Sequence, residues 1–320
     1  MEKTLSLQKE SVLSIKSALE FLAKGQLISV ATETVYGLVG DSSNSESINK
    51  IYKLKKRPTN NPLIIHVNSI EMAKKISHFN RDAVTLAKCF WPGPLTLILN
   101  VKKNKLVCSK AIANLRTIAV RMPQKKIFLE IIKRFNKPLA APSANMSGYI
   151  SPTKAEHVND SFKNNLGVII DSGKCKYGLE STIVNLAKKP YKIERIGIID
   201  EHNIFSKTKL NVKGFKKSKL LISPGQLKHH YSPNTPIELN VKIPVKDTAF
   251  LSFGLDYDSS IENSLNLSRK GSLSEAAFNL FDYMRRLDKL NLKKILVSPI
   301  PNKGIGIVIN EKLKKASFKK

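Results

Sequence analysis

The sequence is poor in cysteine and in long apolar runs. Its three cysteines, Cys89, Cys108 and Cys175, lie far apart and form no Cys-x-x-Cys pair. This excludes a disulfide framework and a cysteine zinc site, and it favours a reducing, cytoplasmic location. No apolar run approaches the roughly 18 residues that a membrane helix needs, and acidic residues interrupt the N-terminal stretch. We therefore expect no signal peptide and no membrane partner.

Histidines with metal-binding spacing are also missing. The six histidines include one adjacent pair, His229 and His230, but none follows the His-x-x-x-His pattern. We therefore predict no metal bound directly by protein ligands. Hydrogen-bonded or solvated histidines are the simpler interpretation.

Acidic residues are few, since 25 Asp and Glu stand against 54 Lys and Arg, giving a formal charge of +29. Such an excess can indicate nucleic-acid binding, because clustered cations release counterions from a phosphate backbone. The lysines, however, are spread along the whole chain, and their densest cluster lies within residues 207–219. We interpret that cluster as a solvated linker, with a weak tRNA contact as the alternative.

What is present is typical of a folded protein, with 42% hydrophobic and 25% charged residues in a chain long enough for two domains. Apolar residues at helical spacing from Val12 to Leu22 end at Gly25, and a buried strand is expected next. The expected strands cover residues 27–31, 62–67, 95–101, 117–121, 167–171 and 181–186. With helices between several of them, they predict an α/β domain over residues 1–205.

The rest of the chain predicts a linker and a smaller domain. Residues 206–236 are rich in Lys, Ser, Pro and Gly, which is typical of a linker. Residues 248–253 and 294–298 are expected to be strands, and Ser272 with Glu275 forms a capping-box pattern before a helix. Strand, helix and strand with a right-handed crossover predict a doubly wound parallel sheet, a Rossmann-like domain, over residues 237–320.

Three segments place polar residues and glycines among apolar ones near strand ends, where α/β proteins bind ligands. They cover residues 31–38, 53–67 and 140–148. The sequence contains no Walker-type loop and no nucleophile elbow, so phosphate binding would depend on side-chain cations and hydroxyls. Taken alone, a cluster such as Lys55, Lys56 and Arg57 is equally explained as a solvated helix end before Pro58.

Seven blocks in order are more specific than any one of them. They are Thr-Glu-Thr-Val-Tyr-Gly-Leu (residues 32–38), Lys-x-Arg-Pro (55–58), Asn-Pro-Leu-Ile (61–64), Trp-Pro-Gly-Pro-Leu-Thr (91–96), Val-Arg-Met-Pro (120–123), Ala-Pro-Ser-Ala-Asn (141–145) and Glu-Ser-Thr-Ile-Val (180–184). Together they resemble the signature blocks of the threonylcarbamoyl-AMP synthase family, with its YrdC-like domain. Ser-Pro-Gly-Gln-Leu (223–227), His-Tyr-Ser-Pro (230–233) and Gly-Ile-Gly (304–306) resemble the long form of that family, which adds a linker and a Rossmann-like domain.

The resemblance implies a fold and an activity. The fold would be an α/β YrdC-like twisted mixed sheet with flanking helices, followed by a smaller C-terminal parallel-sheet domain. The activity would be an L-threonylcarbamoyladenylate synthase, a nucleotidyltransferase that joins L-threonine, bicarbonate or CO2 and ATP, with Mg2+ accompanying the ATP. Its product would pass to a tRNA threonylcarbamoyltransferase for the modification of tRNA.

The resemblance also implies roles for individual residues. A catalytic tetrad around the nucleotide phosphates would consist of Lys55, Arg57, Ser143 and Asn145. ATP would be bound by Arg57, Asn61, Thr117, Ser143, Ser151, Arg195 and Tyr231. L-threonine would be bound by Thr34, His66, Arg121, Ala141 and Ser181.

Two positions depart from the family pattern, and one aromatic residue suggests a moving part. Ala31 stands where the family usually has proline, which we expect to loosen a turn, and Ile196 replaces a proline that commonly follows Arg195. Tyr231 lies between a histidine and a Ser-Pro turn in a segment composed like a tether. We expect the linker to be a lid that closes over ATP, the alternative being that Tyr231 packs the linker onto the first domain.

Two other functions remain alternatives. A non-catalytic RNA-binding protein would suit the positive charge, but it has no need of the phosphate tetrad together with a threonine pocket. Carbamoyl transfer in hydrogenase maturation uses a related domain with paired Cys-x-x-Cys motifs, and the three scattered cysteines argue against it.

Overall fold

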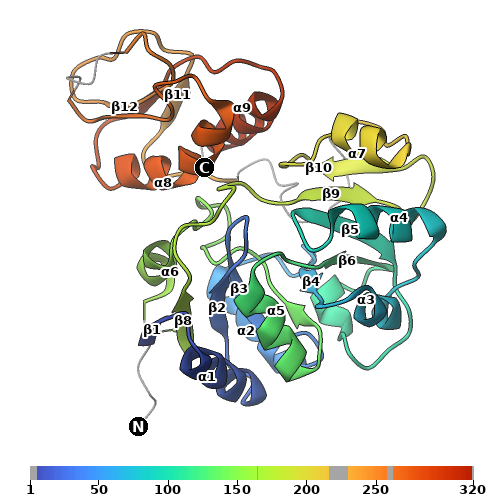
Figure 1. Ribbon diagram of the computed structural model, residues 1–320. Helices are drawn as coiled ribbons and strands as arrows, with labels where there is room; N and C mark the ends of the chain where they lie inside the picture. Colours follow the sequence, from blue (N-terminus) through green and yellow to red (C-terminus); the bar gives the residue numbers. More distant parts are fainter. Residues whose placement is uncertain (1–5, 164, 216–229, 258–261, 319–320) are drawn as a thin grey trace.

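The computed structural model describes residues 6–163, 165–215, 230–257 and 262–318, and within these ranges the chain forms two sheets (Figure 1). The larger sheet has ten strands in the order β1-β8-β2-β3-β7-β4-β6-β5-β9-β10. Its strands are β1 (Ser6–Lys9), β2 (Ile28–Ala31), β3 (Tyr36–Asp41), β4 (Ile64–His66), β5 (Leu95–Asn100), β6 (Thr117–Arg121), β7 (Leu139–Ala140), β8 (Val168–Asp171), β9 (Thr182–Asn185) and β10 (Lys192–Arg195). Parallel and antiparallel pairs both occur along it, so the predicted mixed α/β sheet is confirmed.

Alternating side chains give this sheet two apolar faces. On β2, Ile28 and Val30 pack with α1 (Val12–Ala23) and α5 (Lys126–Phe135), whereas Ala31 faces the opposite cluster. This follows from the two-residue period of a strand. The opposite cluster is built largely from four further helices: α2 (Ser45–Lys55), α3 (Ile70–Ile76), α4 (Arg81–Phe90) and α6 (Ala155–Phe162), together with the short 3-10 turn Ser109–Ile112.

Helix α1 begins and ends where the sequence predicts. Ser11 and Ser14 form a reciprocal capping box at its start, and Gly25, with a φ of +64°, follows its C-cap. Helix α7 (Glu201–Thr208) runs across the predicted boundary at residue 205. The Ser-Pro-Gly-Gln-Leu block of the linker lies outside the described residues.

The second sheet has four parallel strands in the order β11-β14-β12-β13. Its elements are β11 (Ile237–Leu239), β12 (Ala249–Ser252), β13 (Ser264–Asn266), β14 (Ile295–Val297), α8 (Leu273–Asp288) and α9 (Ile305–Ala316). The Ser272 hydroxyl caps α8 by accepting from the Glu275 amide at 3.3 Å, while the Glu275 carboxylate accepts from Ser268 instead of completing the box. The predicted parallel-sheet domain is confirmed.

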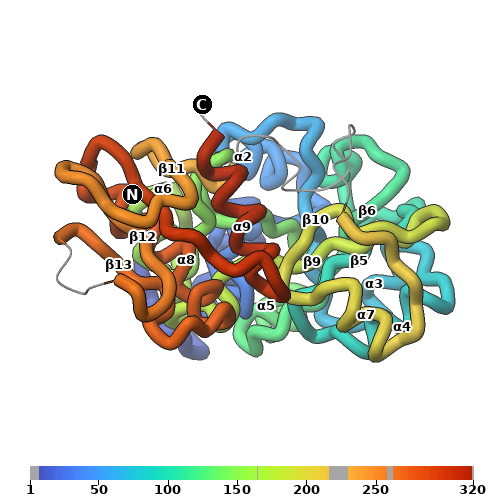
Figure 2. The backbone as a smooth tube through the Cα atoms, turned by 90° about the horizontal axis from the view of Figure 1, so that it is seen from above, coloured from blue at the N-terminus to red at the C-terminus, as the bar shows by residue number. Residues whose placement is uncertain are grey.

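Helices α8 and α9 form the side of the C-terminal domain that packs against the first domain. In Figures 1 and 2 they lie between the second sheet and the first domain, with α9 next to β10. Val35, Ile150 and Leu179 of the first domain belong to the same apolar cluster as Phe281 and Leu280 of α8. None of the helices in the described ranges combines the length and the apolar character that crossing a bilayer requires.

Candidate active site

The register of the central strands brings the predicted threonine residues together. His66 of β4 and Arg121 of β6 are partners in a parallel pair, and Thr96 of β5 is the partner of Ile183 of β9. Paired residues point to the same face of a sheet, so the side chains of His66 and Arg121 project from it side by side. Ile64, two residues before His66, lies on that same face.

A cavity of about 40 Å³ opens on this face. It is lined by residues from the predicted phosphate group and from the predicted threonine group, including Thr34, Arg57, His66, Arg121, Ala141, Ser143 and Arg195. A second cavity of about 330 Å³ lies on the other side of Thr32 and Glu33, and its lining contains none of the predicted site residues. The smaller cavity is therefore the candidate active site.

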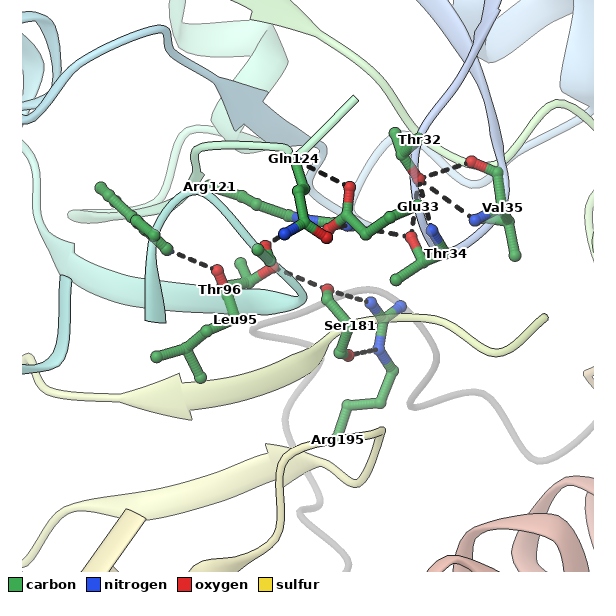
Figure 3. A network of polar contacts seen from close by, with 12 residues as sticks. Thr32, Glu33, Thr34, Val35, Leu95, Thr96, Arg121, Gln124, Ser181 and Arg195 are labelled. Atoms are coloured by element: carbon green, nitrogen blue, oxygen red, sulfur yellow. Dashed lines mark hydrogen bonds and ion pairs between the residues drawn. The ribbon is translucent and has the colours of Figure 1, made fainter. Parts of the chain in front are cut away.

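Arg121 is held at three points in the wall of this cavity (Figure 3). Its Nη2 donates to Oε1 of Glu33 at 2.5 Å and to the Thr34 hydroxyl at 3.0 Å, and its Nε donates to the Gly93 carbonyl at 3.2 Å. These bonds use the Nε and Nη2 hydrogens. The two Nη1 hydrogens have no hydrogen-bond partner among the described residues and can serve a carboxylate.

The turn that carries Thr34 is closed by a side chain. The Thr32 hydroxyl donates to the Val35 carbonyl at 2.7 Å and accepts from the amides of Thr34 and Val35, each at 3.1 Å. It also lies 2.7 Å from the Thr34 hydroxyl. Ala31 pairs with Tyr36 at the end of the β2–β3 hairpin, next to this turn.

Ser181 is fixed by Arg195 on the other side of the cavity (Figure 3). Nε of Arg195 donates to the Ser181 carbonyl at 3.0 Å, and Nη2 donates to the Ser181 hydroxyl at 2.9 Å. The same hydroxyl lies 2.8 Å from that of Thr96. Arg195 lines the cavity, whereas Ser181 is fully buried and lies outside that lining.

Arg57 is anchored by the segment that follows it. Its Nε donates to the Asn61 carbonyl at 2.9 Å, and its Nη2 donates to Oδ1 of Asn61 at 2.5 Å and to the Pro62 carbonyl at 2.8 Å. Within the described residues, no hydrogen bond engages Nη1, which leaves two donors for an anion. Burial, with a smaller contribution from the charge of Arg195, lowers the pKa of Arg57 to about 10, so the guanidinium stays charged at neutral pH.

Lys55 shapes the loop that carries Ser143 and Asn145. Its Nζ donates to the carbonyl oxygens of both residues at 2.5 Å, and its side chain is 1% exposed. An ammonium has three donors, so one remains. Burial, and then the neighbouring charge of Arg57, hold the pKa of Lys55 well below its usual value. An incoming anion would favour the charged form.

The two histidines at the cavity are buried and neutral. Burial is the main reason that the pKa of His66 and that of His230 lie well below the ordinary value. Nearby cations add to the effect, namely Arg121 at His66 and Lys315 at His230. Nδ1 has no partner in either ring, so both offer a buried polar atom to a ligand.

Tyr231 follows the cavity-lining His230 and is fully buried. Its ring stacks on Phe281 of α8 at 5.2 Å, and Nζ of Lys312 on α9 lies 5.0 Å from its centre. Its hydroxyl interacts with the carboxylate of Glu180 in the cavity wall. The ring therefore packs on α8 and α9, within an apolar cluster that also contains Val35, Ile150 and Leu179 of the first domain. The Ser232 amide ties the segment to the Gly148 carbonyl of the first domain at 2.8 Å.

Four further predicted residues lie outside the cavity lining, and three of them hold residues of the site. Asn61 holds Arg57, Asn145 holds Lys55, and the Ser151 hydroxyl donates to Glu180 at 2.6 Å. Thr117, by contrast, lies at the start of β6, four residues before Arg121, or roughly 13 Å along the strand. Ile196, the second departure from the family pattern, accepts from Lys312 through its carbonyl at 3.3 Å.

Two acidic residues of the site were not predicted. Glu33 neutralises Arg121, and Glu180 lines the cavity with a buried carboxylate. Both stand inside the motif blocks next to predicted residues, and an acidic residue in such apolar surroundings was the available signal. The part of the chain that the structure describes contains no group of three or more His, Cys, Asp or Glu side chains suited to a metal ion.

Similarity to known proteins covers both domains. Residues 20–197 match the family model described as telomere recombination, named for Sua5, YciO and YrdC, and residues 191–317 match the one described as threonylcarbamoyl-AMP synthase, C-terminal domain. The chain is 33% identical over 320 residues to the threonylcarbamoyl-AMP synthase of Pyrococcus abyssi, covering 95% of this chain and 94% of that protein. It is 32% identical to the Bacillus subtilis protein of that name, covering 95% and 92%. The crystal structure of P. abyssi Sua5 complexed with L-threonine matches with a TM-score of 0.88 at 31% identity, covering 98% of this chain and 97% of that one.

Proposed function

Because the chain belongs to the threonylcarbamoyl-AMP synthase family, we propose that it condenses L-threonine, bicarbonate and ATP into threonylcarbamoyl-adenylate and pyrophosphate. One observation carries the proposal. Arg57 and Ser143, suited to phosphates, line the same cavity as Thr34, His66 and Arg121, suited to an amino acid. A site that joins an amino acid to a nucleotide needs this juxtaposition.

Bicarbonate takes up a proton and loses water to supply CO2, and the reaction then balances as two steps. The amine nitrogen of threonine bonds to the carbon of CO2 and loses a proton, which gives a carbamate. A carbamate oxygen then bonds to the α-phosphorus of ATP as the bond from that phosphorus to the bridging oxygen breaks, and pyrophosphate leaves with the electron pair. Catalysis in this scheme is mainly positioning and charge stabilisation, so it requires no general base in the second step.

The free donors assign the parts of the substrates. The Nη1 hydrogens of Arg57 and the remaining hydrogen of Lys55 bind phosphate oxygens, because cations in a buried site stabilise charge that water would otherwise solvate. The Nη1 hydrogens of Arg121 bind the threonine carboxylate. The hydroxyl of Thr34, which lines the cavity, and that of Ser181, which Arg195 holds next to it, hydrogen-bond the polar atoms of threonine. An apolar amino acid would leave both hydroxyls without those partners.

Magnesium enters as a companion of ATP. Mg2+ is usually held by one or two carboxylates together with substrate phosphates. The motifs predict no protein ligand for the ion, but the carboxylate of Glu180 lines the cavity and fits such a role. When bound, the ion would offset triphosphate charge.

The product is a labile mixed anhydride, which requires a consumer. We place a tRNA threonylcarbamoyltransferase downstream and the reaction in the cytoplasm, where free thiols such as the exposed Cys89 persist. A direct tRNA contact is the weaker possibility. Of the alternatives, a protein that only binds RNA does not require phosphate-binding and threonine-binding residues in one cavity.

The test is a pyrophosphate-release assay with the full chain, ATP, Mg2+, bicarbonate and one amino acid at a time. We expect release only when L-threonine and bicarbonate are both present. Equal release with valine, or without any amino acid, would remove the threonine assignment. Tight RNA binding without any pyrophosphate release would favour the RNA-binding alternative.

A further inference from the structure

Helix α8 of the C-terminal domain contacts the segment that leads out of the phosphate loop. Asp288, 3% exposed, accepts a hydrogen bond from the Tyr149 hydroxyl through Oδ2 and one from the Thr235 amide, at 2.8 Å, through Oδ1. One carboxylate at the end of α8 therefore holds both the end of the linker and Tyr149 of the first domain.

Arg285 is one turn earlier on the same helix face. Its Nη2 donates to the Ile150 carbonyl at 2.5 Å, its Nη1 donates to the His157 carbonyl at 3.4 Å, and its guanidinium carbon lies 4.9 Å from the centre of the Tyr149 ring. The side chain is 4% exposed, and burial lowers the pKa of Arg285 to about 10, so it remains a cation at neutral pH. The position of a buried cation is tightly constrained, because losing a hydrogen-bond acceptor leaves its charge unsatisfied.

The segment that these two residues hold continues into the site. Nδ2 of Asn145 donates to the Tyr149 carbonyl at 2.9 Å, and the Asn145 carbonyl accepts from Lys55. Ser151, which follows Ile150, binds Glu180 in the cavity wall. Two hydrogen bonds thus separate Lys55 from the Tyr149 backbone, and α8 fixes that backbone from the other side.

We infer that Arg285 and Asp288 are positioning residues for ATP: from the second domain they set the geometry of the loop formed by residues 143–151. The inference rests on the proposed function, because it assigns this loop to the nucleotide phosphates. It gives the C-terminal domain a definite part in the reaction, on the phosphate side of the site.

Asp282 is a matched control on the same helix. It is 2% exposed, one turn before Arg285, and it also crosses the domain boundary, to Lys154 at 3.0 Å, His157 at 3.3 Å and Lys174 at 3.2 Å. None of these partners belongs to the loop of residues 143–151. If KM for ATP depended on domain contact in general, substitutions at Asp282, Arg285 and Asp288 would all raise it. If it depends on the geometry of the loop, only substitutions at Arg285 and Asp288 would raise it.

The experiment compares Arg285→Gln, Asp288→Asn, Tyr149→Phe and Asp282→Asn in the full chain. We expect the first three to raise KM for ATP roughly tenfold, the effect of losing part of a charged hydrogen bond, with KM for threonine nearly unchanged. Asp282→Asn should lower the melting temperature at least as much as Asp288→Asn and leave KM for ATP near the unmodified value. Asp288→Asn combined with Tyr149→Phe should raise KM for ATP no further than either substitution alone. The reason is that both act on the same hydrogen bond, the one between Tyr149 and Asp288.

Three results would overturn the inference: equal rises in KM for ATP in Asp282→Asn and Arg285→Gln, rises that are equal for ATP and threonine, or no rise in any variant. Direct calorimetric titration with ATP separates this failure from failure of the proposed function. If the unmodified chain binds ATP but releases no pyrophosphate with threonine, the reaction is misassigned, and the ATP affinities of the four variants still decide the positioning role.

Discussion

The carboxylate of Glu33 and the guanidinium of Arg121 form a buried ion pair at 2.5 Å, and each side chain is 4% exposed. The charge of Arg121 is thus balanced before any substrate binds. A threonine carboxylate would be the second carboxylate bound to Arg121. The other carboxylate oxygen of Glu33, Oε2, already accepts from the Gln124 amide at 2.8 Å. Glu33 consequently fixes how Arg121 presents its remaining donors.

Arg121→Ala should weaken L-threonine binding by about 2 to 4 kcal/mol, because a desolvated charge pair with the substrate is lost. Its ATP affinity should change little. Calorimetric titration with each substrate measures both effects. An unchanged threonine affinity would contradict the placement of the amino acid.

Arg57→Ala should show the reverse pattern, with ATP binding weakened by about 2 to 4 kcal/mol and threonine binding nearly intact. The reason is that the Nη1 group of Arg57 faces the phosphates in our assignment. The same titrations apply, and Arg121→Ala is the matched control. Parallel losses of both substrates in both variants would show a general collapse of the site instead of two subsites.

Glu33→Gln keeps the size of the side chain and removes its charge. We expect the free energy of unfolding to fall by about 3 to 5 kcal/mol, as for other buried pairs that lose one partner, since Arg121 would stay buried without its counter-ion. Threonine should offset part of this loss, because its carboxylate would supply the missing charge. Thermal melts with and without threonine test this, and a smaller threonine-induced rise in melting temperature than in the unmodified chain would argue against it.

The linker prediction concerns Tyr231 and the neighbouring cavity. At about 40 Å³, and with His230 in its lining, the cavity is far smaller than the roughly 300 Å³ or more of common ligand sites. We expect the segment beginning at His230 to move when ATP enters. Tyr231→Ala should lower turnover or increase the ATP hydrolysed per product formed, and Tyr231→Phe, which keeps the stacking on Phe281, is its control. Product formation at the intact rate in both variants would exclude the lid.

The buried histidines predict how stability changes with pH. Folding lowers the pKa of His66 and of His230 below the ordinary value, so below about pH 6.5 the unfolded chain binds more protons than the folded one. Their contribution to stability is complete above the unfolded pKa and is lost as pH falls through the folded values. For each unit that the pH falls between the unfolded and the folded pKa, each histidine should then lower the free energy of unfolding by about 1.4 kcal/mol. Urea unfolding between pH 7 and 5.5 measures the slope, and His66→Gln should flatten it; an equal slope in that variant would refute the contribution of His66.

Periodicity and motif order predict much of the fold, and packing contacts between separate elements account for what they miss. Strand β3 was not predicted, because Gly37 and Gly40 give its sequence the character of a loop. In the structure a Cβ on Gly40 would lie 2.5 Å from Oγ of Ser47, so the glycine allows α2 to pack directly on the strand. That close approach involves a helix formed later in the chain and has no local signature.

The site was predictable as a set of residues but not as a set of bonds. The motifs identify Arg121 and Ser181 but not their bonds. The Glu33 partner of Arg121 is 88 residues away along the chain, and the Arg195 partner of Ser181 depends on the register of the β9–β10 pair. The contribution of α8 to the phosphate loop is of the same kind. Domain packing decides it, and no motif block contains Arg285 or Asp288.

The loop between α4 and β5 contains Trp91, the single tryptophan of the chain. Its indole donates to the Leu95 carbonyl at 2.7 Å, and Gly93, two residues on, accepts from Arg121. Tryptophan emission from the unmodified protein therefore originates beside the proposed amino-acid pocket, without any attached dye. Emission changes on mixing with threonine would follow the filling of that pocket in real time, unobscured by a second indole elsewhere.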